Sequence, residues 1–146
     1  MKKPLLVAVL ALVAASPSWA LEFRTTARAA VLYDAPSQQH ATKVAVAGVG
    51  VPFEVFVDTE SWIKVRDATG RLAWLEKSAL GNARNVMVSV EEARVNQQPL
   101  ATAELRFRAI RGVLLTARGE PRAGWIEVQH ADGMSGWVRQ HEVWGQ

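Results

Sequence analysis

The segment WIKVRDATGRLAWL (residues 62–75) is matched 63 residues later by WIEVQHADGMSGWV (residues 125–138). The first and the thirteenth residue of each segment are tryptophans. The same offset relates further pairs in the chain: Gly70 with Gly133, and Pro36 with Pro99. Agreement of several positions at one fixed offset indicates an internal repeat. We therefore expect two copies of one small domain.

Short alternating runs of β-branched and aromatic residues dominate the remainder of each copy. Residues 52–57 read PFEVFV, and residues 71–75 read RLAWL. Such runs, separated by turn residues, are typical of strands. Gly70 and Gly133 each lie between two runs and suit the left-handed position of a hairpin turn. The sequence therefore predicts an all-β protein, with the two tryptophans of each copy on adjacent antiparallel strands.

The first 20 residues have the pattern of a secretory signal peptide. Lys2 and Lys3 form a positive start, residues 5–15 are apolar, and Ser18-Trp19-Ala20 offers small residues to signal peptidase. The apolar run is too short for a helix that crosses the bilayer, which needs about 20 residues. We expect cleavage after Ala20 and a periplasmic mature chain without a membrane span.

Composition narrows the choice of partner. The sequence has 17 Lys and Arg against 14 Asp and Glu, and removal of Lys2 and Lys3 brings the two signs nearly into balance. Nucleic-acid-binding domains usually carry a basic stripe, so we expect no nucleic-acid partner. The sequence has no cysteine. Disulfides and a thiol nucleophile are therefore excluded.

The histidines do not form a catalytic motif. His40, His130 and His141 fall in separate loop or turn segments, and none accompanies a Gly-x-Ser-x-Gly motif. A serine nucleophile requires a positioned histidine and an orienting acid. His130 with Asp132, or His141 with Glu142, supplies only two ligands on a turn, which is a weak metal signal. We expect no catalytic residue, no metal and no cofactor.

The segments VLYDAPS (31–37), WIKVRD (62–67) and Ala73-Trp74 resemble the tandem bacterial SH3-like (SH3b) proteins that proteobacteria export to the cell envelope. The resemblance implies an all-β fold of two small SH3-like β-barrels, each with five or six strands, after the signal peptide. The domains would span residues 21–82 and 83–146. It also implies that the partner is peptidoglycan or an envelope protein.

The segment VLYDA (31–35) also resembles the tyrosine motif of eukaryotic SH3 domains, which bind proline-rich peptides. Ala35 stands at the second tyrosine position, and Ile63 follows Trp62 where that class has paired tryptophans. Loss of an aromatic wall removes much of the platform for a polyproline helix. We therefore do not expect that specificity.

Aromatic residues supply the candidate ligand site. The candidate groove consists of Tyr33, Asp34, Trp62 and Trp125. We interpret Trp74 and Trp137 as core or closure residues, and Gly70 and Gly133 as hairpin turns. Trp62 and Trp125 each begin a strand, where an indole either offers its face to a ligand or closes one end of the barrel. Tyr33 precedes a proline turn, where we expect it to face solvent.

Two functions remain open after these exclusions. The first is a non-catalytic binding module of the cell envelope that recognises peptidoglycan or an envelope protein. The alternative is a structural or assembly subunit in which the two barrels pack together without a small-molecule ligand. The short joint at residues 81–84 motivates this alternative, because it lacks a flexible Gly/Ser tract.

Overall fold

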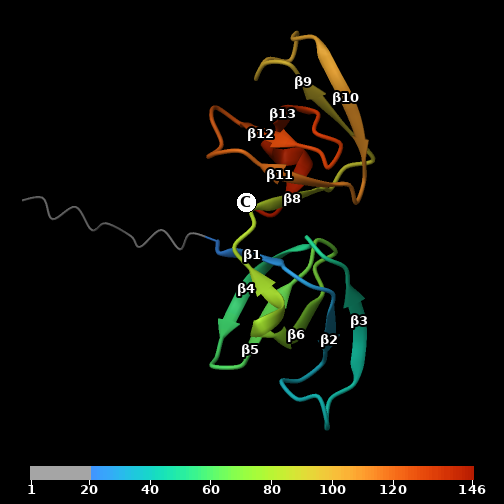
Figure 1. The fold of residues 1–146 in the computed structure, drawn as a ribbon, viewed down its shortest axis with the longest axis vertical. Helices are drawn as coiled ribbons and strands as arrows, with labels where there is room; N and C mark the ends of the chain where they lie inside the picture. The colour runs from blue at the N-terminus through green and yellow to red at the C-terminus, as the bar shows by residue number, and fades with distance from the viewer. Residues whose placement is uncertain (1–20) are drawn as a thin grey trace, which may run out of the picture.

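The computed structural model describes residues 21–146, which form strands and two short 3-10 helices (Figure 1). The expected signal peptide lies outside the described residues. The strands form two seven-stranded antiparallel sheets, which confirms the predicted all-β class. Within residues 21–146, no helix is long and apolar enough to cross a membrane.

The first sheet has the strand order β3-β2-β6-β5-β4-β1-β7. Its strands are β1 (Phe23–Thr26), β2 (Ala30–Tyr33), β3 (Lys43–Ala47), β4 (Pro52–Asp58), β5 (Trp62–Arg66), β6 (Leu72–Glu76) and β7 (Leu80–Gly81). The 3-10 helix η1 (Lys77–Ala79) leads from β6 into β7.

The second sheet has the strand order β10-β9-β13-β12-β11-β8-β14. Its strands are β8 (Asn85–Val88), β9 (Glu92–Asn96), β10 (Leu105–Ile110), β11 (Leu114–Ala117), β12 (Trp125–Gln129), β13 (Ser135–Arg139) and β14 (Val143–Trp144). The 3-10 helix η2 (Gln140–Glu142) precedes β14.

The two sheets share one topology, because each strand of the first sheet has its counterpart seven strands later at the same place in the second. From β5 to β7 and from β12 to β14, all element bounds keep the offset of 63 residues. Each sheet has seven strands rather than the five or six that the resemblance implied. Two of them, β7 and β14, are only two residues long and pair with the first strand of their domain.

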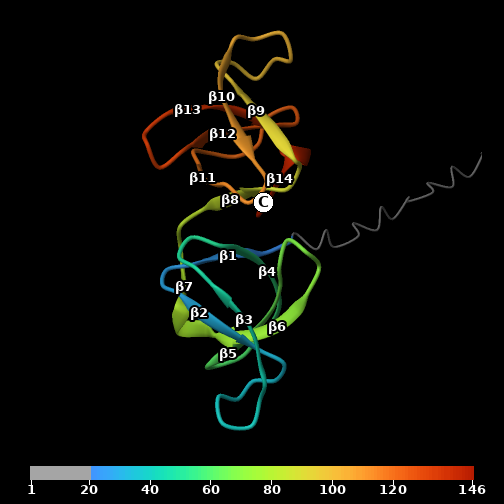
Figure 2. The same cartoon turned by 90° about the vertical axis from the view of Figure 1, so that its right-hand side faces the viewer.

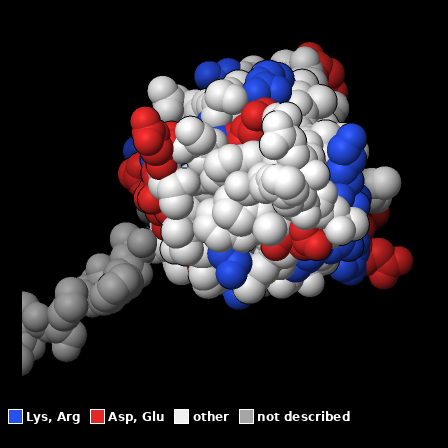
Figure 3. Space-filling view, turned by 90° about the horizontal axis from the view of Figure 1, so that it is seen from below, with Lys and Arg blue, Asp and Glu red and all other residues white. Residues whose placement is uncertain are grey.

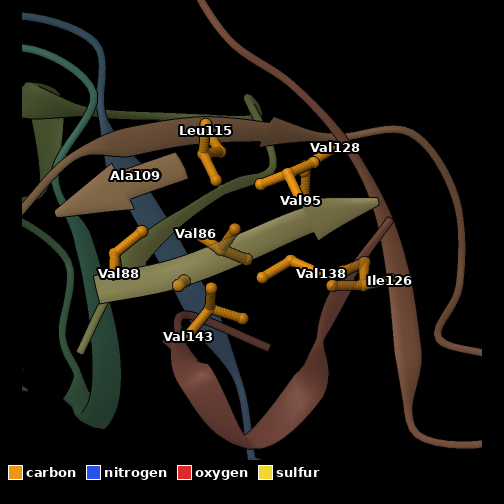
Figure 4. Packing of buried hydrophobic residues seen from close by; sticks show 10 residues of the cluster. Val86, Val88, Val95, Ala109, Leu115, Ile126, Val128, Val138 and Val143 are labelled. Atoms are coloured by element: carbon orange, nitrogen blue, oxygen red, sulfur yellow. The ribbon is translucent and has the colours of Figure 1, made fainter. Parts of the chain in front are cut away.

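Each domain has its own core, as expected for independently repeated units. The first core consists of Ala30, Leu32, Ala47, Phe53, Ile63, Val65, Ala73, Leu75 and Ala79. The second consists of Val86, Val88, Ala93, Val95, Ala109, Leu115, Ile126, Val128, Val138 and Val143 (Figure 4). In both, every second residue of the central hairpin points inward, as the period of a strand requires.

This alternation corrects the interpretation of Trp74 and Trp137 as core residues. Both are half-buried, and neither belongs to a core cluster. Their strand neighbours, such as Ala73 and Leu75, point inward instead. Because successive residues of a strand point to opposite faces, the tryptophans lie on the outer face of each sheet.

The second domain packs on the first through β14 and β8 (Figure 2). The Trp144 ring lies 5.1 Å from the Phe23 ring in an edge-to-face arrangement, and the Arg66 guanidinium lies 5.4 Å from the Trp144 ring centre. The Asn85 side-chain amide donates a 3.0 Å hydrogen bond to the Gly50 carbonyl. Both apolar and polar contacts therefore connect the two domains.

Candidate functional site

The register of β2, β5 and β6 gathers aromatic side chains on the outer face of the first domain. Trp74 lies opposite Tyr33 on one side and opposite Lys64 on the other, while Trp62 lies opposite Glu76. Residues directly opposite in antiparallel strands project to the same face. The sheet therefore brings these five side chains, from segments far apart in the sequence, into one surface.

Tyr33 and Trp62 are in direct edge-to-face contact. Their ring centroids are 5.6 Å apart, with planes at 82°, a geometry that aromatic pairs favour. The Lys64 ammonium lies 5.9 Å from the Trp74 ring centre, within the range of a cation–π interaction. Tyr33 is only 6% exposed, which corrects the expectation that it faces solvent. It ends β2 and is covered, while Trp62 remains half-buried.

A cavity of about 140 Å³ opens beside Tyr33. Its polar wall is formed by Arg28, Gln38 and Glu76. Gln38 Nε2 donates a 2.6 Å hydrogen bond to Glu76 Oε1, and Arg28 Nη2 lies 3.5 Å from Glu76 Oε2. We call this cavity the first-domain cleft. Its lining joins one aromatic ring, that of Tyr33, to a cation and an anion, and Trp62 lies outside the lining in contact with Tyr33.

Sequence reasoning missed the charged residues of this cleft. Glu76 was predictable in principle, because strand alternation and the hairpin register place it on the face of Trp62 and Trp74. Arg28 and Gln38 lie in the segments that flank β2. No sequence pattern indicates that these two segments converge on Glu76.

Asp34 supports the loop that follows β2. Its side chain is exposed, and its Oδ1 accepts a 2.8 Å hydrogen bond from the Thr42 backbone N–H. The Asp34 backbone N–H in turn donates to the Thr42 carbonyl at 3.1 Å. Asp34 is not among the residues that line the cleft. Its contacts fix the long β2–β3 connection.

Trp125 lies in the other domain and does not share a groove with Tyr33. It is 8% exposed, and the Arg139 guanidinium covers its ring at 4.9 Å. Asn96 occupies the place of Tyr33, because it lies opposite Trp137 as Tyr33 lies opposite Trp74. The Asn96 amide donates to the Leu100 carbonyl at 2.9 Å. The second domain therefore lacks the aromatic pair.

The two repeated glycines occupy the turns of the central hairpins. Gly70 has φ +89° and Gly133 has φ +94°, a region that residues with a Cβ rarely adopt. Asp67 Oδ1 accepts hydrogen bonds from the Thr69 and Arg71 backbone N–H groups in the first turn. In the second turn, Asp132 Oδ1 accepts one from the Met134 N–H.

Charged groups outside the cleft form local pairs. His130 Nδ1 lies 3.0 Å from Asp132 Oδ2, and the pKa of Asp132 is lowered by the Met134 backbone N–H and then by His130. In the first domain, the Lys77 hydrogen bond lowers the pKa of Asp58. Across residues 21–146, no three His, Cys, Asp or Glu side chains are grouped to hold a metal ion.

The lower face of the first domain has a largely uncharged middle. Figure 3 shows this face from below, with Lys, Arg, Asp and Glu lying mostly toward its margin. Both signs of charge occur along that margin. Charged side chains of both signs therefore surround a largely uncharged area on this face.

The duplicated topology and the repeated hairpin agree with a comparison against family models. The model described as "Bacterial SH3 domain" matches residues 26–81 and again residues 89–145. The chain belongs to the bacterial SH3 domain family. It contains two such domains in tandem, which confirms the resemblance seen in the sequence.

Solved structures add only a general likeness. NlpC2 from Trichomonas vaginalis is 12% identical with a TM-score of 0.40, over 85% of this chain and 47% of that chain. NlpC1 from the same organism is 15% identical with a TM-score of 0.40, over 99% of this chain and 52% of that chain. This chain thus spans about half the length of each. No curated protein matches the sequence significantly.

Proposed function

We propose that this tandem bacterial SH3 protein is a non-catalytic binding module of the cell envelope, exported to the periplasm and built from units 21–82 and 83–146. The observation that carries the proposal is the Tyr33–Trp62 pair beside the charged first-domain cleft. Proteins of this family commonly bind peptidoglycan or envelope proteins. The cleft offers suitable chemistry for either.

The cleft and the neighbouring Trp62 together suit a ligand with an apolar face and charged ends. A half-buried indole such as Trp62 can pack against a sugar ring or an alkyl chain, because it presents a large flat surface. Arg28 can pair with a carboxylate and Glu76 with an ammonium group. Peptidoglycan presents sugar rings together with the carboxylates and amines of its stem peptides. We therefore rank peptidoglycan first among the candidate ligands.

Retention on purified cell-wall sacculi tests this proposal. The chain from residue 21 onward is expected to sediment with sacculi, and Trp62→Ala is expected to reduce its affinity roughly tenfold, the effect of about 1.4 kcal/mol. Trp137→Ala is the matched control, because Trp137 is also a half-buried indole on an outer face but lies in the second domain. Circular dichroism verifies that both variants fold.

Two results would contradict the cell-wall proposal. One is the absence of retention for the unmodified chain. The other is equal retention of the Trp62→Ala and Trp137→Ala variants, since this would place binding outside the first-domain cleft. Loss of retention in Glu76→Gln with the fold intact would show that the carboxylate takes part.

A second candidate function is that of a scaffold in which the two barrels form one unit. The observation that favours it is the contact of Trp144 with Phe23 and Arg66 across the joint. A module with fixed domains holds two surfaces at a defined spacing. Independent tumbling of the halves by NMR relaxation would argue against this function.

A further inference from the structure

The hairpin turn between β12 and β13 brings a histidine and a methionine together. The His130 backbone N–H donates a 2.8 Å hydrogen bond to the Met134 carbonyl, next to the Gln129–Ser135 pair at the end of the ladder. Residues that lie opposite each other in antiparallel strands project to the same face. Both side chains accordingly line one cavity of about 230 Å³. An imidazole and a thioether therefore share one small site.

The Asp132 carboxylate contacts both residues. Its Oδ2 lies 3.0 Å from His130 Nδ1, and its Oδ1 accepts a 2.9 Å hydrogen bond from the Met134 backbone N–H. The Asp132 backbone N–H is farther from His130 Nδ1, at 3.4 Å. An ionised carboxylate can only accept, so we assign the ring hydrogen to Nδ1. His130 Nε2 then keeps a free lone pair, as in metal-binding histidines that donate to a carboxylate.

The remaining lining of the cavity is mostly apolar. It includes the side chains of Phe107, Ile110 and Val113. Arg108 also contributes to the lining, but its Nη1 lies 2.5 Å from Glu92 Oε1, so a carboxylate offsets its charge. Hard cations such as Mg²⁺ take oxygen ligands and give up water reluctantly. An apolar lining with nitrogen and sulfur donors therefore suits a softer ion.

The turn itself does not require these two donors. In the first domain, Asp67 and Arg71 stand in the places of His130 and Met134 at the offset of 63 residues. The Asp67 N–H donates to the Arg71 carbonyl at 3.0 Å, so the same backbone pairing forms there. Met134 is also 46% exposed, and burial in a core therefore does not account for it. The histidine and the methionine are additions to a turn that forms without them.

We propose that His130 Nε2 and Met134 Sδ bind copper(I), a monovalent soft cation, in the second domain. Thioether sulfur is a soft ligand that selects copper(I), and imidazole nitrogen also suits copper. Met134 supplies the donor that the pair of His130 and Asp132 lacks. The Asp132 carboxylate balances the single positive charge of the ion. This site is separate from the first-domain cleft and does not depend on the function proposed for that cleft.

Titration with silver(I) followed by NMR tests the site. Silver(I) has the charge and the soft-ligand preference of copper(I) but is stable in air. The chain from residue 21 onward, with labelled methionine methyls and histidine rings, is titrated with silver nitrate in a chloride-free buffer at about pH 7, where imidazole is free to bind metal. We expect one equivalent to shift the Met134 methyl and the His130 Nε2 resonances together. The Met87 methyl is the internal control, because Met87 lies in β8, outside this cavity.

Three variants assign the donors. The double variant His130→Asp with Met134→Arg copies the turn residues of the first domain, and we expect it to fold and to bind no silver(I). Asp132→Asn keeps the acceptor for the Met134 N–H but loses the acceptor for His130 Nδ1, so we expect an affinity about 10–100-fold lower. His141→Ala is the matched control, because His141 is exposed and lies outside the cavity. It is expected to bind normally.

Repeating the titration with copper(I) under nitrogen completes the test, and we expect the same two resonances to shift. An unmoved Met134 methyl in the unmodified chain overturns the proposal. Equal binding by the double variant and the unmodified chain also overturns it, since this would place the ion outside the turn. Binding of silver(I) without binding of copper(I) overturns the assignment of the ion.

Discussion

The two domains share a topology but differ in what they place on it. Their central hairpins have matching bounds at one sequence offset, and their inward positions carry similar aliphatic residues. The outer face differs, because Tyr33 in the first domain is replaced by Asn96 in the second. A tyrosine extends an aromatic surface, whereas the asparagine ties down its own loop. The duplication preserved the core and changed the surface.

A second difference concerns the tryptophan that begins each central hairpin. Trp62 lies opposite Glu76, an acid that also lines the cleft. Trp125 lies opposite Arg139, whose guanidinium stacks on the indole. An arginine that covers the ring leaves little of it for a ligand. Under the proposed function, the comparison favours the first domain as the binding domain, because its indole is the less covered of the two.

The largest expected loss of stability comes from truncating a core residue, and making the same change in each domain tests whether the two cores are equivalent. Ile63 and Ile126 occupy matching positions and are both fully buried. Truncation to alanine at either site is expected to lower the free energy of unfolding by about 2–5 kcal/mol, because it removes buried methylenes and leaves a cavity. Urea denaturation followed by tryptophan fluorescence measures it. A loss below 1 kcal/mol at only one site would show that the two cores differ in packing.

A smaller loss of stability is expected from substitutions at one position that differs between the domains, in strands β6 and β13. Gly136 corresponds to Ala73, and a Cβ at Gly136 would lie 2.6 Å from the Asn96 carbonyl oxygen. Gly136→Ala is therefore expected to cost about 1–3 kcal/mol of stability through overpacking. Ala73→Gly is the reciprocal change and is expected to cost about 0.5–1 kcal/mol. Equal stability of Gly136→Ala and the unmodified chain would refute a close approach of β13 and β9.

The next largest loss of stability is expected when the contact between the two domains is removed. Trp144 has Gly81 as its counterpart, so Trp144→Gly gives the second domain the residue of the first. The change removes the ring contacts with Phe23 and Arg66, and we expect it to lower stability by about 1–2 kcal/mol. Calorimetry is also expected to resolve separate unfolding of the two halves. An unchanged thermogram would mean that the joint contributes nothing to cooperativity.

The sequence was sufficient to predict the repeat, the all-β class and the paired tryptophan strands. These features depend on short-range periodicity and on a fixed offset, both of which are visible in the chain. The outer position of Trp74 could also have been predicted from the sequence. Trp74 projects to the same face of β6 as Glu76, whereas the apolar residues Ala73 and Leu75 project to the opposite, inward face. The core interpretation of Trp74 is wrong because strand parity, not the size of the side chain, decides which face of the sheet it occupies.

The rest of the cleft depends on contacts distant in sequence. Gln38 reaches Glu76 across 38 residues, and Arg28 donates to Ser78 across 50 residues. The burial of Trp125 likewise depends on how Arg139 lies over its ring. Side-chain placements of this kind follow from the assembled sheet, and no local pattern encodes them.

The smallest expected effect is a pH dependence that differs between the domains. In the first domain, a hydrogen bond from Lys77, aided by the charges of Lys77 and Arg24, lowers the pKa of Asp58. A carboxyl whose pKa is lower in the folded state stabilises the fold above its unfolded pKa, about 3.9, and loses that contribution as pH falls through the folded pKa. Stability is therefore expected to decrease on acidification below about pH 4.

Asp58→Asn isolates the part of this dependence that belongs to the first domain. The Asp58 side chain is solvent-accessible, so its ion pair is screened by salt and the difference should be small. We expect the variant to lose less stability than the unmodified chain between pH 5 and pH 2, while Asp132→Asn changes only the second domain. Denaturation at low salt, with each domain followed by NMR, measures both slopes. Identical slopes for the unmodified chain and Asp58→Asn would show that Lys77 holds the carboxylate in place without contributing to acid sensitivity.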